Sequence, residues 1–311
     1  MPVALRDSHI TRGRKSLIGA QMRFDKDRGK LLILSLLPLI LGSTIALSVA
    51  GSSLMGQLLV SSPTFSAAEI AVQAAVSTVL GMTVVLALFW ITERGGRRGQ
   101  KLVVALVMSP MLGFISLFSG ESLLLVMFKG STNVLMAIVL IASLGVSLIS
   151  IVLILTDVIP PIVRGAFAGF YGSVFGTFLG ITMMTSSMIV IVMSIAVEDY
   201  LLTRYSPAAR AEQISEQVGS DPFDYARIKS GSATVGAGDY ITYSLIAAQS
   251  IVFFPFYVWA MTVLLLVFGM FINVTVLVRE GIILPAIPLP ALIALFPWFV
   301  HLSVLALLPG L

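Results

Sequence analysis

Cysteine is absent from the 311-residue chain, and only two histidines, His9 and His301, are present. The chain therefore has no disulfide, no thiolate nucleophile and no cysteine-ligated metal. Two histidines so far apart in the sequence do not predict a metal site, and no motif predicts a cofactor. Chemistry that needs neither a metal nor a thiol is therefore favoured.

Charge is also scarce: 11% of residues are charged, 58% are hydrophobic, and the mean hydropathy is +1.03. This composition predicts an all-α polytopic membrane protein and argues against a globular enzyme. The net charge of +4 does not indicate a nucleic-acid partner. In a membrane protein, lysine and arginine first report orientation in the bilayer. The expected environment is a lipid bilayer.

Nine apolar segments are long enough to cross a membrane, which takes about 20 residues. They cover 31–50, 70–92, 102–128 and 133–155, begin near Pro160, Thr182 and Ala233, and end with 254–278 and 284–308. The third and fourth segments can also be divided differently. We predict a tail at 1–30, six helices in 31–203, a cytoplasmic loop at 204–232 with an amphipathic stretch at 208–218, and three helices in 233–311.

The basic residues predict the orientation. The tail is rich in lysine and arginine and has no apolar core, so it does not resemble a cleaved signal peptide. If the tail is cytoplasmic, Lys129 alone of the 19 basic residues falls outside. Such a bias predicts a cytoplasmic N-terminus and, with an odd number of spans, an external C-terminus.

A carboxylate stands at the start of the seventh apolar segment, where Gly236, Ala237 and Gly238 precede Asp239. A charge at the centre of a membrane helix costs roughly 2.5–3.5 kcal/mol, so an aspartate kept within the membrane usually has a function. The glycines loosen the helix where a backbone or substrate comes close. Asp199 lies near the inner end of the preceding helix. Because consecutive helices are antiparallel and rise about 1.5 Å per residue, both aspartates are expected at similar depth.

Two neighbouring carboxylates do not both ionise readily, so they share a proton. One then acts as a base that activates water, and the other as an acid that protonates a leaving amide. Each residue also has a simpler interpretation. Asp239 can cap its helix or reach the interface, and Asp199 can join Glu198 and Arg204 in an interfacial charge cluster.

Three motifs carry a family resemblance. The segment 236–244, GAGDYITYS, resembles the GxGD segment of the presenilins, a family related to signal peptide peptidase. The preceding 196–199, AVED, resembles the family's Tyr-Asp motif, with Glu198 in place of tyrosine. The family's Pro-Ala-Leu motif corresponds to Pro285-Ala286-Ile287, with Ile in place of Leu, although a literal Pro290-Ala291-Leu292 follows. Prolines there keep the backbone out of a helix, but a proline-rich helix start is the simpler alternative.

The resemblance implies an intramembrane aspartyl protease with a nine-helix, presenilin-like fold. Asp199 and Asp239 would be catalytic. The substrate-binding residues would be Gly236, Ala237, Gly238, Pro285, Ala286 and Ile287. Substrates would be single transmembrane helices. The tail-in orientation favours presenilin over signal peptide peptidase, and the short tail and loop suit compact prokaryotic, archaeal members.

Two other functions stay open. Paired carboxylates also carry protons or cations in secondary transporters and channels, although we detect no inverted repeat. A catalytically silent scaffold would keep the fold, and Glu198 in place of tyrosine is compatible with it. The oligomeric state is open, a homo-oligomer included.

Two further features are expected to be structural. Five glycines in the fifth helix have the small-xxx-small spacing that favours close helix packing: Gly165, Gly169, Gly172, Gly176 and Gly180. Asp157 and Arg164, on either side of two prolines, are expected to form an interfacial ion pair rather than a proton path.

Overall fold

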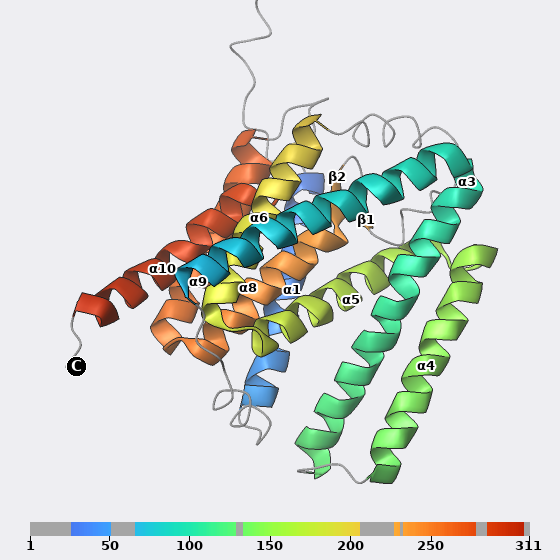
Figure 1. Ribbon diagram of the computed structural model, residues 1–311, viewed down its shortest axis with the longest axis horizontal. Coiled ribbons are helices and arrows are strands. Elements are labelled where there is room, and N and C mark those ends of the chain that lie inside the picture. The colour runs from blue at the N-terminus through green and yellow to red at the C-terminus, as the bar shows by residue number, and fades with distance from the viewer. Residues whose placement is uncertain are drawn as a thin grey trace, which may run out of the picture.

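The computed structural model describes residues 26–50, 66–128, 133–205, 227–230, 233–277 and 285–307, and helices account for nearly all of them (Figure 1). The helices are α1 (Lys26–Ala50), α3 (Ala67–Phe128), α4 (Asn133–Thr156), α5 (Pro161–Thr182), α6 (Thr185–Tyr205), α8 (Ala237–Phe253), α9 (Phe256–Ile272), the short π-helix η2 (Asn273–Leu277) and α10 (Pro288–Leu307). The strands β1 (Arg227–Ser230) and β2 (Ala233–Gly236) form an antiparallel hairpin.

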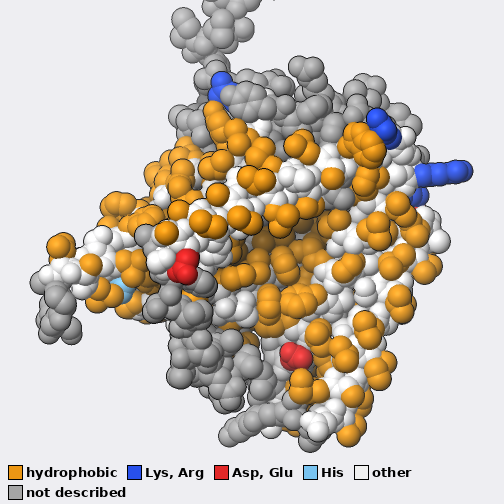
Figure 2. All heavy atoms as spheres, viewed as in Figure 1, with side chains coloured by type: hydrophobic (Ala, Val, Ile, Leu, Met, Phe, Trp, Pro, Cys, Tyr) orange, Lys and Arg blue, Asp and Glu red, His pale blue; other side chains and the backbone are white. Residues whose placement is uncertain are grey.

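Six stretches of these helices are long and apolar enough to cross a membrane: Leu32–Ala50, Arg98–Leu124, Asn133–Thr156, Val163–Thr182, Phe256–Thr275 and Pro288–Leu307. Their outer surfaces carry many exposed large hydrophobic side chains. On the face in Figure 2, apolar side chains dominate and the basic ones gather near the upper end. The described parts of the chain are therefore almost entirely helical, with the long apolar helices of an integral membrane protein. The helices α6 and α8 and the start of α3 are outside this set, so nine spans are not established.

The gap between the predicted segments 70–92 and 102–128 implies a loop at 93–101. This prediction is wrong, because the structure continues the helix through these residues. The helix α3 bends only at Gly96, where φ is 54° and ψ is −147°. A positive φ at this position is tolerated by glycine without steric cost. Figure 1 shows the two arms of α3, residues 67–95 and 97–128, meeting at this bend. The first arm contacts α6, and the second packs along α4.

One expected helix start is wrong, because the seventh helix begins at Ala237 and residues 233–236 form β2. The expected first and last segments, 31–50 and 284–308, agree to within a few residues with the apolar stretches Leu32–Ala50 and Pro288–Leu307, although α1 itself begins earlier, at Lys26. The remaining tail and the amphipathic stretch at 208–218 lie outside the described residues.

The helix α8 lies at the centre of the bundle, where α1, α5, α6, α9 and α10 all contact it. Its tightest neighbour is α5, whose glycines face it at three successive turns. A Cβ atom at Gly172 would lie 2.9 Å from the Cβ of Tyr240, and one at Gly180 would lie 2.6 Å from the Leu245 carbonyl oxygen. At Gly176 it would collide with the Ile241 carbonyl oxygen. The small-residue packing predicted for this helix is confirmed at these three glycines.

A buried amide ties α8 to the turn between α5 and α6. Gln249 is fully buried, and its side chain lies against the hydroxyl of Thr185 at 3.1 Å. In the orientation that satisfies both of its ends, its nitrogen donates to the carbonyl oxygens of Gly180 and Met183, and its oxygen accepts from Thr185. These carbonyls lie in the last turn of α5, where a helix leaves acceptors unsatisfied.

Replacing Gln249 by methionine tests this role. The substitution keeps the side-chain length and removes both donors, so the α5 carbonyls lose their partner. We expect the free energy of unfolding in detergent to fall by about 1–3 kcal/mol, the usual cost of leaving a buried acceptor without its donor. A thermal unfolding midpoint equal to that of the wild type would contradict this assignment.

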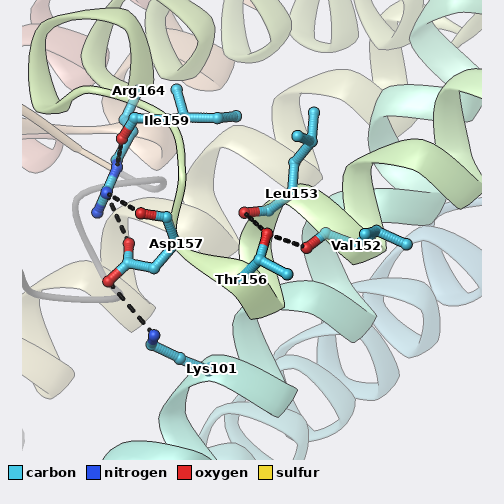
Figure 3. Close-up of polar contacts among 7 residues, drawn as sticks. All are labelled: Lys101, Val152, Leu153, Thr156, Asp157, Ile159 and Arg164. Carbon is cyan, nitrogen blue, oxygen red and sulfur yellow. Dashed lines mark hydrogen bonds and ion pairs between the residues drawn. The ribbon is translucent and has the colours of Figure 1, made fainter.

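The predicted ion pair between Asp157 and Arg164 is present, and Figure 3 shows both side chains at the junction of α4 and α5. The shortest N–O distance is 2.6 Å, and Lys101 of α3 approaches Asp157 at 3.3 Å from the other side. Arg164 is only 3% exposed, and its Nε donates to the Ile159 carbonyl oxygen at 2.6 Å. The ion pair, together with Lys101, therefore connects α3 to the junction of α4 and α5.

Candidate functional site

Asp199 lies in the second half of α6, and its carboxylate meets the start of α10. Its Oδ2 accepts a hydrogen bond from the backbone amide of Ile287 at 3.0 Å, and the amide of Ala286 also bonds to this carboxylate. Its Oδ1 lies 3.5 Å from the hydroxyl of Thr203, one turn further along α6. Asp199 is thus bonded to backbone from a segment 88 residues away in the sequence.

Asp239 lies in the first turn of α8. Its Oδ2 accepts from the amide of Gly236, the N-cap residue, at 2.9 Å. A carboxylate at the third helical position commonly bonds in this way, so the simpler capping role of Asp239 is realised for one oxygen. No described residue is hydrogen-bonded to Oδ1 of Asp239. The cap fixes the side chain and leaves the second oxygen available.

The two aspartates come from helices that contact each other, α6 and α8, and lie near enough for an electrostatic interaction between their carboxylates. Tyr243, one turn after Asp239, lies near both carboxylates. Both aspartates are partly buried residues. The structure thus brings near each other two carboxylates that lie 40 residues apart in the sequence, and no described residue bonds to the second oxygen of Asp239. This is the arrangement in which a proton is shared between neighbouring acids.

The proline-rich segment before α10 distinguishes the two candidate motifs. Pro285, Ala286 and Ile287 are not helical, and the backbone amides of Ala286 and Ile287 bond to Asp199. Pro290 lies inside α10 instead, where it packs so tightly on α9 that a Cβ at Gly269 would lie 2.5 Å from the Pro290 Cα atom. Of the two, the segment 285–287 is therefore the one whose backbone reaches the aspartates.

The three residues before Asp239 that were expected to bind substrate, Gly236, Ala237 and Gly238, lie in different surroundings. Gly236 ends β2 and caps α8, and Gly238 is exposed with no atom within 4 Å of the position of an added Cβ. Ala237 is only 7% exposed and packs in an apolar cluster with residues of α3, α4 and α5. The side chain of Ala237 is therefore part of the core, and only its backbone borders the site.

Glu198 lies beside Asp199 in the sequence but contacts a different helix. A Cβ atom at Gly81, in the first arm of α3, would lie 2.6 Å from the Glu198 carboxylate. On the same interface, the Ser187 hydroxyl lies 3.1 Å from the side-chain oxygen of Gln73. Glu198 thus takes part in the contact between α3 and α6, away from the aspartate pair.

Sequence reasoning missed Asn273 and the strand pairing before Asp239. Asn273 is a lone carboxamide in an apolar segment, and the rule that intramembrane polar residues are rarely accidental would have identified it. For the hairpin, the β-branched Thr234 and Val235 before Gly236 were a weak strand signal. Among the described residues, no group of three or more histidines, aspartates and glutamates is placed to hold a metal.

Neither a protein-family model nor a curated protein matches this sequence, so the resemblance to presenilins rests on the three sequence motifs.

Proposed function

We propose that this protein is an intramembrane aspartyl protease of the presenilin type, with Asp199 and Asp239 as its catalytic pair. The observation that supports it best is the convergence of three separate segments. Two helices each supply one aspartate, and the non-helical segment 285–287 bonds to Asp199. Non-helical backbone at membrane depth is tolerated where it lines a protein cavity. A hydrolytic site within the membrane would need such a cavity.

The chemistry needs one proton shared by the pair. The ionised carboxylate takes a proton from water as the water oxygen adds to the scissile carbonyl carbon. The protonated carboxyl then gives its proton to the amide nitrogen as the carbon–nitrogen bond breaks. The products are a new carboxyl group and a new amine, and the pair regains its single shared proton.

The substrate class follows from the surroundings of Asp239. A transmembrane helix must unwind before a peptide bond is exposed, because its amide and carbonyl groups are bonded internally. The strand β2 ends three residues before Asp239, and β1 occupies only one of its edges among the described strands. An extended peptide is stabilised by adding to such an edge. We therefore propose an unwound transmembrane helix as the substrate.

The proposal includes nine membrane spans, counting α6, α8 and both arms of α3 with the other five helices. The helix α8 has only 17 residues, and α6 carries three charged residues in its second half, Glu198, Asp199 and Arg204. Each of these two helices supplies one aspartate to the site. The N-terminus would be cytoplasmic and the C-terminus external, as in the compact prokaryotic members that the motifs resemble.

The proposal is tested with purified protein in liposomes and a single-span substrate whose products are identified by mass spectrometry. We expect cleavage within the span that is insensitive to chelators and to thiol and serine reagents. The rate should fall at both low and high pH, because activity needs one ionised and one protonated carboxyl. Proton or cation flux without any cleavage would instead favour the transporter.

A further inference from the structure

The peptide group between Ala286 and Ile287 is held on both of its sides. Its carbonyl oxygen accepts from Asn273 Nδ2 at 2.7 Å and from the Tyr243 hydroxyl at 3.0 Å. Its N–H donates to Oδ2 of Asp199 at 3.0 Å. Three elements, η2, α8 and α6, thus meet at one peptide group beside the aspartate pair.

Peptide geometry links these two sets of bonds. A trans peptide is planar, so its carbonyl and its N–H point in opposite directions, and the described chain contains no cis bond. Fixing the carbonyl oxygen with two donors therefore fixes the direction of the N–H. We propose that Asn273 and Tyr243 are positioning residues that aim the Ile287 N–H at Asp199. This inference builds on the proposed function, in which Asp199 is catalytic.

The sequence explains why the carbonyl is free for this use. In a regular helix the Ala286 carbonyl would accept from the residue four positions later, which is Pro290. Proline has no N–H, so this acceptor has no backbone donor within α10. The first backbone bond recorded at this end of α10 joins the Ala291 amide to the Ile287 carbonyl oxygen. The literal proline motif thus leaves the Ala286 carbonyl to the two side chains.

Both donors are buried side chains that bond to the Ala286 carbonyl oxygen. Asn273 is 9% exposed and opens η2, the single π-helical turn that follows α9. Such turns occur frequently at functional sites, because they turn a side chain out of the regular helical register. Tyr243 is 3% exposed and lies one turn after Asp239 on α8. Its hydroxyl connects the segment 285–287 to the helix that carries the second aspartate.

The variants Asn273→Leu and Tyr243→Phe remove one donor each with little change in volume, and the double variant removes both. Thr275→Val is the matched control, because Thr275 lies in the same π-helix and, among the described residues, its hydroxyl bonds only to the Phe271 carbonyl oxygen one turn earlier. Amide hydrogen exchange of the fragment 284–290 is the direct readout. Its three prolines have no amide, so after loss of the first residue only Ala286, Ile287 and Leu289 report.

We expect each single variant to speed exchange in this fragment by about threefold to tenfold, and the double variant to speed it further. Cleavage should lose kcat by a similar factor with little change in KM, because both side chains are buried and bond to the Ala286 carbonyl oxygen. The Thr275→Val protein should match the wild type in both assays. All variants are compared after their far-ultraviolet circular dichroism shows the wild-type helix content.

Exchange unchanged in the double variant would overturn the inference, whatever happens to cleavage. Faster exchange with full kcat would overturn the link from the peptide to Asp199. If the wild type cleaves no substrate while the variants still exchange faster, the anchoring of the segment stands and the protease proposal fails. The two proposals can therefore fail separately.

Discussion

Replacing Asp199 or Asp239 by asparagine is expected to lower the rate of intramembrane cleavage by about 100-fold or more. Asparagine keeps the size and one oxygen of aspartate but takes no proton from water and gives none to the leaving nitrogen. General acid–base catalysis contributes typically about 10²–10⁴-fold for each group. Initial rates on one substrate in liposomes measure the loss. The two single losses should not multiply in the double variant, because both groups act on one shared proton.

Glu198→Gln is the matched control for these variants. It changes a carboxylate to an amide at the position next to Asp199, but its side chain packs against Gly81 of α3. We expect this variant to keep cleavage within about threefold of the wild type, because it has no role in proton transfer. Full activity of a folded Asp199→Asn or Asp239→Asn protein would contradict the assignment.

The substitution Gly176→Ala is expected to have the largest effect on stability. Its new methyl group would collide with the carbonyl oxygen of Ile241 and with the Ser244 hydroxyl, and backbone atoms cannot turn aside as a flexible side chain does. Overpacking of this kind costs about 3 kcal/mol at the upper end of its usual range. The thermal unfolding midpoint in detergent should fall by roughly 5–10 °C. Ile241 and Ser244 belong to α8, whose first turn contains Asp239, so cleavage should also decrease.

Gly145→Ala is the control for this change. Gly145 lies in α4, and no atom lies within 4 Å of its added Cβ. Alanine there restricts the unfolded chain and favours the helix, so we expect the midpoint to stay or to rise slightly. Equal midpoints for Gly176→Ala and Gly145→Ala would show that α5 and α8 do not pack as closely as described.

The aspartate pair illustrates what hydropathy and helix geometry predict well. Two carboxylates near facing ends of consecutive apolar helices must lie at similar depth, and the structure places Asp199 and Asp239 close enough for their charges to interact. Close packing against α5 was predicted from the spacing of its glycines, without its partner. Glycines at every fourth position make a smooth helix face whatever the partner turns out to be.

The sequence did not predict three features. The hydropathy of 93–101 indicated a polar loop, but a helix tolerates polar residues outside the bilayer and bends only at Gly96. The other two features depend on partners distant in the chain. The strand β2 occurs where an apolar run predicted helix, because its pairing with β1 outweighs the local preference. The role of Asn273 becomes visible only with Ala286 in place, 13 residues later.

The central claim is that this chain hydrolyses peptide bonds within a membrane with two aspartates. Its most direct test is mass spectrometry of a single-span substrate in liposomes, with wild-type, Asp199→Asn and Asp239→Asn proteins compared in ¹⁸O-labelled water. We predict that the wild type yields two fragments that together equal the substrate plus one water, with ¹⁸O in the new carboxyl group. Both variants should leave the substrate intact. Identical fragments from all three proteins would contradict the claim.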